Sequence, residues 1–174
     1  MKKLEDFIYD VPDFPIPGII FRDITGVLNN AEGLQLAIDE LKNKLEGVEF
    51  DAIAGTEARG FLFGVPLAYA TKKRFVPIRK RGKLPRETIQ KTYNLEYGTA
   101  TLEAERDSIN PGDRVVIVDD LIATGGTVKA VTEIIEELGG EVAKCLFLIE
   151  LEGLKGREIL KGYDVDSVIK YPGA

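Results

Sequence analysis

The segment Val115 to Thr127, VVIVDDLIATGGT, constrains the fold more than any other part of this chain. Its first four residues form an apolar run that is typical of a parallel strand buried on both faces. After the segment, apolar residues recur with a helical period at Val128, Val131, Ile135 and Leu138. The pattern therefore predicts a strand that passes through a tight loop into a helix.

The loop of this segment carries groups that suit a sugar phosphate. Gly125 and Gly126 allow backbone N–H groups to come close to a ligand, and the N-terminus of the following helix favours an anion. Asp119 and Asp120, at the carboxyl end of the strand, suit hydroxyl hydrogens better than phosphate oxygens. Together these groups predict a site for a ribose phosphate.

The loop also has a plainer interpretation. The two glycines would then form an ordinary tight turn, with the acids solvated or capping the helix. Other phosphate loops fit less well. The chain has no GxGxxG motif, and Phe61, rather than a lysine, follows the GxxxxG of Gly55 to Gly60.

The residue composition excludes several kinds of catalytic site. The 174 residues include no histidine, which excludes a Ser-His-Asp triad, a histidine base and a histidine metal site. Cys145 is the one cysteine, and its apolar surroundings in CLFLI predict a buried core residue. The length and the 44% of hydrophobic residues predict a single domain over residues 1–174. Without an apolar run of membrane length or a signal peptide, a cytoplasmic protein that binds no membrane is expected.

Positive charge is concentrated in one stretch of an acidic chain. The net charge is -6, yet Lys72 to Lys91 contains nine lysine or arginine residues and the single acid Glu87. Beside a sugar-phosphate loop this stretch would neutralise a further phosphate group, and a solvated loop is the alternative. Within it, Arg79 to Asn94 has no period and is predicted to be a long mobile loop over the site. The acidic chain as a whole argues against nucleic-acid binding.

Strands and helices are expected to alternate along the chain. Helices are predicted at Ala31 to Leu45 and at about Gly60 to Ala70, the second interrupted near Pro66. Further strands are predicted at Ala52 to Ala54, Phe75 to Ile78, Tyr97 to Leu102 and Val142 to Ile149. This order predicts an α/β fold with a mostly parallel central sheet flanked by helices, whose ligand lies beyond the carboxyl ends of the strands.

Motifs along nearly the whole chain resemble the adenine phosphoribosyltransferases, a family of type I phosphoribosyltransferases. The central segment is similar to that family's motif for 5-phosphoribosyl 1-diphosphate (PRPP). The other similar motifs are FPIPGIIFRDIT at Phe14 to Thr25, GTEARGFLFG at Gly55 to Gly64, RKRGKLPRET at Arg79 to Thr88 and NLEYGT at Asn94 to Thr99. The resemblance implies the type I phosphoribosyltransferase fold, with a small N-terminal hood at about residues 1–30 and a mobile lid loop.

The resemblance also assigns roles to single residues. It places Asp119 and Asp120 on the ribose hydroxyls and Ile20, Phe21 and Arg22 on adenine, although Phe21 by itself has the pattern of a core residue. The residues that it places on the 5-phosphate are Ala123, Thr124, Gly125, Gly126 and Thr127. Those that it places on the diphosphate are Arg59, Arg79, Lys80 and Lys83, whose cations suit phosphate oxygens.

Three of the implied site residues are expected to act in the reaction itself. Arg59 and Lys83 would neutralise the departing diphosphate, together with Mg²⁺ held mainly by PRPP oxygens and water rather than by the protein. Glu96 matches the family's acid near the purine nitrogens, where it would bind N7 or carry the proton as N9 attacks. Tyr97 would support the lid, or serve as an ordinary aromatic residue at the start of a strand.

The resemblance implies a pentosyltransferase of purine salvage that converts adenine and PRPP into AMP and diphosphate, acting as a homodimer. Two rivals stay open. One is a PRPP-sensing regulator without turnover, although the chain has no residues to spare for a DNA-binding domain. The other is a transferase for a 6-oxopurine such as xanthine.

Overall fold

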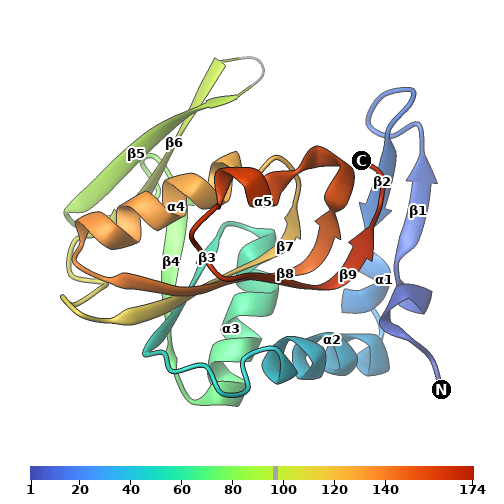
Figure 1. The fold of residues 1–174 in the computed structure, drawn as a ribbon, viewed down its shortest axis with the longest axis horizontal. Coiled ribbons are helices and arrows are strands. Elements are labelled where there is room, and N and C mark those ends of the chain that lie inside the picture. The colour runs from blue at the N-terminus through green and yellow to red at the C-terminus, as the bar shows by residue number, and fades with distance from the viewer. Residues whose placement is uncertain (96–97) are drawn as a thin grey trace.

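A mixed sheet forms the centre of the molecule, which a computed structural model describes at residues 1–95 and 98–174 (Figure 1). In sheet order, the described strands are β5 (Thr88–Leu95), β6 (Gly98–Glu105), β4 (Arg74–Lys80), β3 (Ala52–Thr56), β7 (Arg114–Ile122), β8 (Glu141–Leu151) and β9 (Val165–Tyr171). The run from β4 to β9 is parallel, whereas β6 and β5 are added antiparallel at one edge. The predicted α/β fold with a mostly parallel sheet is confirmed.

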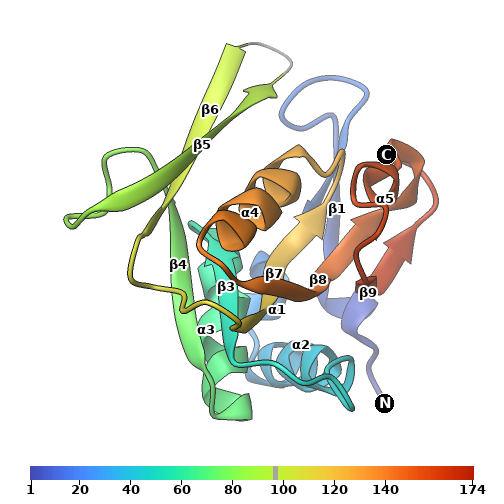
Figure 2. The ribbon, with the colours of Figure 1, turned by 60° about the vertical axis from the view of Figure 1, so that its left-hand side comes forward.

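Helices cover both faces of this sheet (Figure 2). The helices α2 (Ala31–Asn43) and α3 (Arg59–Thr71) lie on one face, and α4 (Gly126–Glu137) lies on the other. Side chains of β7 pack into the hydrophobic clusters on both faces of the sheet. Val116 and Val118 join the cluster with α2 and α3, while Val115 and Ile117 join the cluster with α4. This is why the strand is apolar at every position rather than at alternate ones.

Helix α3 corrects one expectation, because it is not interrupted at Pro66. A proline removes one backbone hydrogen bond, but here the flanking apolar residues bury one side of the helix, including Phe63 and Leu67. The helix ends where Thr71 donates its hydroxyl to the carbonyls of Leu67 and Ala68. Lys72 follows in the left-handed conformation, with φ 59°.

The predicted lid loop also needs correction, because its second half is strand β5. Thr88 to Leu95 pairs with β6 residue by residue, and the two strands form an arm that extends from the sheet (Figures 1 and 2). Ile89 and Tyr93 lie on the same face of β5, with Lys91 between them, and pack against the core beneath α4. Lys91 also forms an ion pair with Glu137 of α4. The sequence did not predict this strand, because the residues between Ile89 and Tyr93 are all polar and hide the two-residue period of a strand.

The N-terminal residues form a small hairpin beside β9 (Figure 1). It consists of a 3-10 turn at Leu4–Phe7, strands β1 (Tyr9–Pro12) and β2 (Ile20–Asp23), and the short helix α1 (Thr25–Leu28). Near the C-terminus, a second 3-10 turn at Glu152–Leu154 leads into the short helix α5 (Gly156–Ile159). Within the described residues, no helix combines the length and the apolar character needed to cross a membrane.

Candidate active site

A cavity of about 280 Å³ lies at the carboxyl ends of β3 and β7. Its walls come from the loop after β3, from Lys80 of β4, from Tyr93 and Leu102 of the arm, and from residues 119–128. The carboxyl edge of a parallel sheet is the usual ligand position in such folds. The arm and the N-terminal hairpin rise beyond this same end of the sheet, on opposite sides (Figures 1 and 2).

The two acids of β7 have different partners within the cavity. Asp119 accepts a hydrogen bond from the Thr56 hydroxyl at 2.9 Å and another from the backbone N–H of Asp120 at 2.8 Å. Burial, followed by the charge of Asp120, raises the pKa of Asp119. The Asp120 carboxylate, almost fully buried, forms an ion pair with Nε of Arg59 at 3.2 Å. The structure therefore brings both predicted ribose ligands together with Arg59.

The predicted phosphate loop, residues 123–127, lines the cavity and leads into α4. Gly125 is in the left-handed region, with φ 88°, and no side chain of the described residues caps the helix behind it. A Cβ on Gly125 would lie 2.9 Å from the carbonyl oxygen of Gly156 in α5. Only glycine fits this position, and the first N–H groups of α4 remain available to an anion.

The cationic side of the cavity is organised by Glu57. Its Oε1 accepts from the backbone N–H of Lys80 at 2.8 Å and from Nε of Arg79 at 3.2 Å. Burial by itself would raise the pKa of Glu57, but the bonds from Lys80 and Arg79 outweigh it and lower that pKa. Lys80 and Arg59 line the cavity, whereas Arg79 and Lys83 are absent from its wall. Of the four cations predicted to bind diphosphate, two therefore already face the site.

The predicted purine residues do not line this cavity. Ile20 is exposed, and Phe21 packs edge-on against Phe14, with ring centroids 5.2 Å apart. The Arg22 guanidinium forms an ion pair with Asp10 at 2.6 Å and stacks over the Tyr171 ring at 4.0 Å. The Arg22 side chain thereby fastens the hairpin to β9.

Glu96 and Tyr97 lie outside the described residues. Seven residues of the cavity wall were not among the predicted site residues, namely Thr56, Glu57, Tyr93, Leu102, Leu121, Ile122 and Val128. The first two belong to the GTEAR motif, from which only the arginine was selected. Tyr93 could have been found from its position four residues after Ile89, on the same face of a strand, whereas the contact between the predicted phosphate loop and α5 has no local signal in the sequence.

Comparisons with known proteins identify the family of this chain. A family model described as the phosphoribosyl transferase domain matches residues 25–170. The adenine phosphoribosyltransferase of Lachnoclostridium phytofermentans is 61% identical to this chain, and the match covers 99% of each protein. This chain belongs to the adenine phosphoribosyltransferase family.

Solved structures of this family share the fold of the chain. The adenine phosphoribosyltransferase of Thermoanaerobacter pseudethanolicus matches with a TM-score of 0.94 and 53% identity, covering 97% of this chain and 100% of the other. The Saccharomyces cerevisiae member matches with a TM-score of 0.89 and 40% identity, covering 95% of this chain and 96% of the other. The type I phosphoribosyltransferase fold that the sequence implied is confirmed.

Proposed function

We propose that this chain transfers the 5-phosphoribosyl group of PRPP to N9 of adenine and releases diphosphate, which makes AMP in purine salvage. One observation carries the proposal. A single cavity joins an uncapped helix N-terminus, the half-buried Asp119 beside the buried Asp120, and two cations, Arg59 and Lys80. These three groups match the 5-phosphate, the ribose hydroxyls and the diphosphate of one PRPP molecule.

The reaction we propose depends on charge placed on either side of the sugar. The loop at residues 123–127 would hold the 5-phosphate, and Asp119 and Asp120 would hold the ribose hydroxyls. As the bond from C1 to diphosphate breaks, positive charge develops on the sugar ring and negative charge on the leaving group. The acids stabilise the ring, while Arg59 and Lys80 stabilise the diphosphate, with Arg79 and Lys83 joining them from the neighbouring segment.

Magnesium is the cofactor that we propose for this reaction. No group of three or more His, Cys, Asp or Glu residues in the described parts of the chain could hold a metal ion. We propose that the ion is held mainly by PRPP oxygens and water, as Mg²⁺ commonly is. When bound, it would neutralise part of the diphosphate charge.

The choice of adenine rests on the relatives and on the hood. The Saccharomyces cerevisiae structure is a complex with D-2,5-dideoxy-2,5-imino-altritol 1,6-bisphosphate and adenine. In this chain, Ile20, Phe21 and main-chain groups near Arg22 would bind the base. Glu96 would hydrogen-bond N7 or carry away the N9 proton as N9 attacks C1. A main-chain acceptor facing the 6-amino group of adenine would face an oxygen in a 6-oxopurine, which is unfavourable. We place the enzyme in the cytoplasm.

One assay tests this function. The protein is incubated with PRPP and Mg²⁺ and with adenine, hypoxanthine, guanine or xanthine, and the products are separated by chromatography. We expect AMP from adenine and little nucleotide from the other bases. Nucleotide from xanthine alone would favour the 6-oxopurine enzyme, and no nucleotide from any base would favour a PRPP-sensing regulator. As a variant control, Asp119→Asn with Asp120→Asn should impair PRPP use far more than adenine binding.

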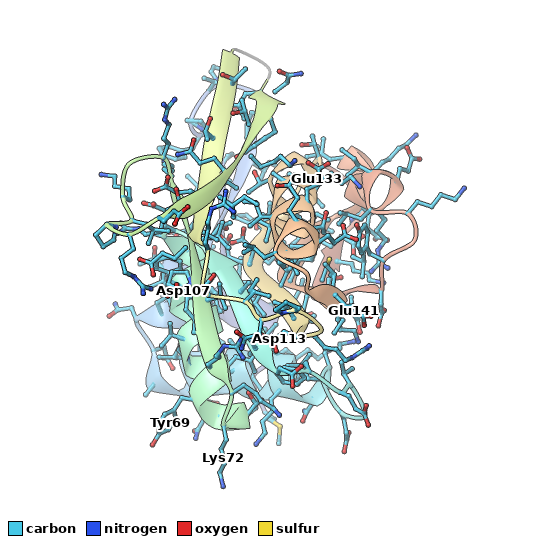
Figure 3. All side chains as sticks on the ribbon, turned by 90° about the vertical axis from the view of Figure 1, so that its left-hand side faces the viewer. Tyr69, Lys72, Asp107, Asp113, Glu133 and Glu141 are labelled. Atoms are coloured by element: carbon cyan, nitrogen blue, oxygen red, sulfur yellow. The ribbon has the colours of Figure 1, made fainter. Side chains whose placement is uncertain are left out.

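We also propose that the enzyme is a homodimer formed through α3. Leu62, Val65 and Tyr69 lie on one face of this helix and are 41%, 49% and 87% exposed, and Figure 3 shows Tyr69 extending away from the body. Two copies related by a two-fold axis would cover this stripe. Light scattering should give a dimer for the parent and a monomer for Leu62→Asp. The control Leu154→Asp, at another exposed leucine, should stay dimeric; a dimeric Leu62→Asp variant would contradict this interface.

A further inference from the structure

Glu103 is a buried acid outside the cavity, in the middle of β6. It is 2% exposed, and its Cα partners are Arg79 in β4 and Gln90 in β5. The preceding residue, Leu102, lines the active-site cavity. Because successive side chains of a strand point to opposite faces, Glu103 faces away from the cavity. It cannot bind the substrate directly.

The Glu103 carboxylate instead accepts hydrogen bonds from residues 81–87, the basic segment between β4 and β5, and from the start of β5. Its Oε1 accepts from the backbone N–H groups of Gly82 at 3.2 Å and of Leu84 at 3.1 Å. Its Oε2 accepts from Nε2 of Gln90 at 3.0 Å and from the Thr88 hydroxyl at 3.4 Å. A carboxylate is well suited to this arrangement, because it accepts at both oxygens and donates at neither when ionised.

These bonds also keep the Glu103 carboxylate ionised. Burial acts against the charged form, but the hydrogen bonds, led by that from Leu84, outweigh it and lower the pKa of Glu103. The segment that it holds carries Arg81, Lys83 and Arg86, so a negative charge beneath the segment also offsets its positive charge.

The two backbone donors lie on either side of Lys83. Fixing Gly82 and Leu84 therefore fixes the backbone of the lysine between them. The carbonyl of Lys83 also accepts from Nη1 of Arg79 at 3.5 Å, and Arg79 is itself held by Glu57 at the edge of the cavity. One chain of contacts thus runs from the buried carboxylate through the basic segment to the cationic side of the site.

We propose that Glu103 is a positioning residue for the diphosphate of PRPP: it holds the backbone of residues 81–87 before the substrate binds, so that less of this segment has to be ordered when Lys83 joins the diphosphate. The inference rests on the proposed transferase function. Ordering the segment in advance lowers the entropic cost of binding the diphosphate, so loss of Glu103 weakens PRPP use rather than adenine use.

Steady-state kinetics of three variants test this role. Glu103→Leu removes the acceptors of Gly82 and Leu84, and we expect KM for PRPP to rise about tenfold or more while KM for adenine changes less than about threefold. Glu103→Gln keeps one carbonyl oxygen for these donors, and the amide of Gln90 can turn to suit it, so this variant should restore most of the PRPP affinity. Gln90→Met removes a bond on the strand side only and serves as the matched control, with KM for PRPP near that of the parent.

A double-mutant cycle distinguishes an effect of Glu103 on the position of Lys83 from a general disturbance of the fold. Lys83→Met should raise KM for PRPP in the parent but add little in the Glu103→Leu background, because the lysine is already misplaced there. Additive effects of the two substitutions would overturn the proposal, as would a Glu103→Gln variant as impaired as Glu103→Leu. Circular dichroism checks that each variant is folded.

Limited trypsin digestion provides a readout that does not need turnover. Cleavage after Arg81, Lys83 and Arg86 should be faster in Glu103→Leu than in the parent or in Gln90→Met. Equal cleavage rates would show that Glu103 does not hold the segment. If the unaltered protein makes no nucleotide, the proposed function fails instead, and the digestion alone decides whether Glu103 orders these residues.

Discussion

Gly125→Ala should destabilise the protein strongly, because the site combines a left-handed backbone with a close contact. The φ of Gly125 is 88°, and an added Cβ would lie 2.5 Å from Cγ2 of Ile159 and 2.9 Å from the carbonyl oxygen of Gly156. The half-exposed Ile159 side chain can rotate away, but the backbone oxygen of Gly156 can move only if α5 moves with it. The phosphate loop therefore cannot accept the methyl group without distortion.

The expected cost is the sum of two effects. Left-handed backbone costs a residue with a Cβ about 1–2 kcal/mol, and overpacking costs about 1–3 kcal/mol. The free energy of unfolding should then fall by about 2–5 kcal/mol. For a chain of this length, Tm should fall by roughly 4–20 °C. KM for PRPP should rise as well, because the distorted loop is the one that we propose binds the 5-phosphate.

Gly162→Ala is the matched control for backbone strain alone. Gly162 also has a positive φ, 98°, but nothing lies within 4 Å of an added Cβ. Its cost should be only about 1–2 kcal/mol. Urea unfolding followed by circular dichroism measures both variants, since the chain has no tryptophan for fluorescence. If both variants lose the same stability, the contact between the phosphate loop and α5 contributes nothing and the reasoning is wrong.

Two further predictions concern buried charges. Asp119→Asn should make stability less dependent on pH: because the pKa of Asp119 is raised, the folded state keeps a proton that the unfolded chain releases, so the parent loses stability as pH rises from the ordinary aspartate range toward that raised pKa. Urea unfolding at several pH values checks this, and parallel profiles would contradict it. Arg157→Met should cost about 1–3 kcal/mol, because the buried Glu150 loses two hydrogen bonds, of 2.7 and 2.9 Å. An unchanged unfolding free energy would show that solvent replaces them.

Short sequence patterns predicted secondary structure correctly where the residues that decide it are neighbours in the chain. The apolar run from Val115 and the apolar residues from Val128 to Leu138 predicted strand β7 and helix α4, which are confirmed, since each depends on residues near in sequence. The phosphate-binding role of the loop between them stays a prediction. Strand β5 was predicted to be part of a loop because one of its faces is polar along its whole length. Its other face is recognised as a core face only when its packing beneath α4 is known. The predicted interruption of the helix near Pro66 was wrong for a related reason, because burial of α3 outweighs a single missing hydrogen bond.

The sequence by itself determined the α/β class and the family, and it predicted the ribose-phosphate segment, because these follow from apolar periods and from short motifs. Only the tertiary structure decided how the site residues pair. It joined Arg59 to Asp120, left Arg79 and Lys83 outside the cavity wall, and placed Glu103 beneath the basic segment. Such contacts bring together residues far apart in the chain, and whether a charge is buried or exposed depends on what the rest of the fold packs around it.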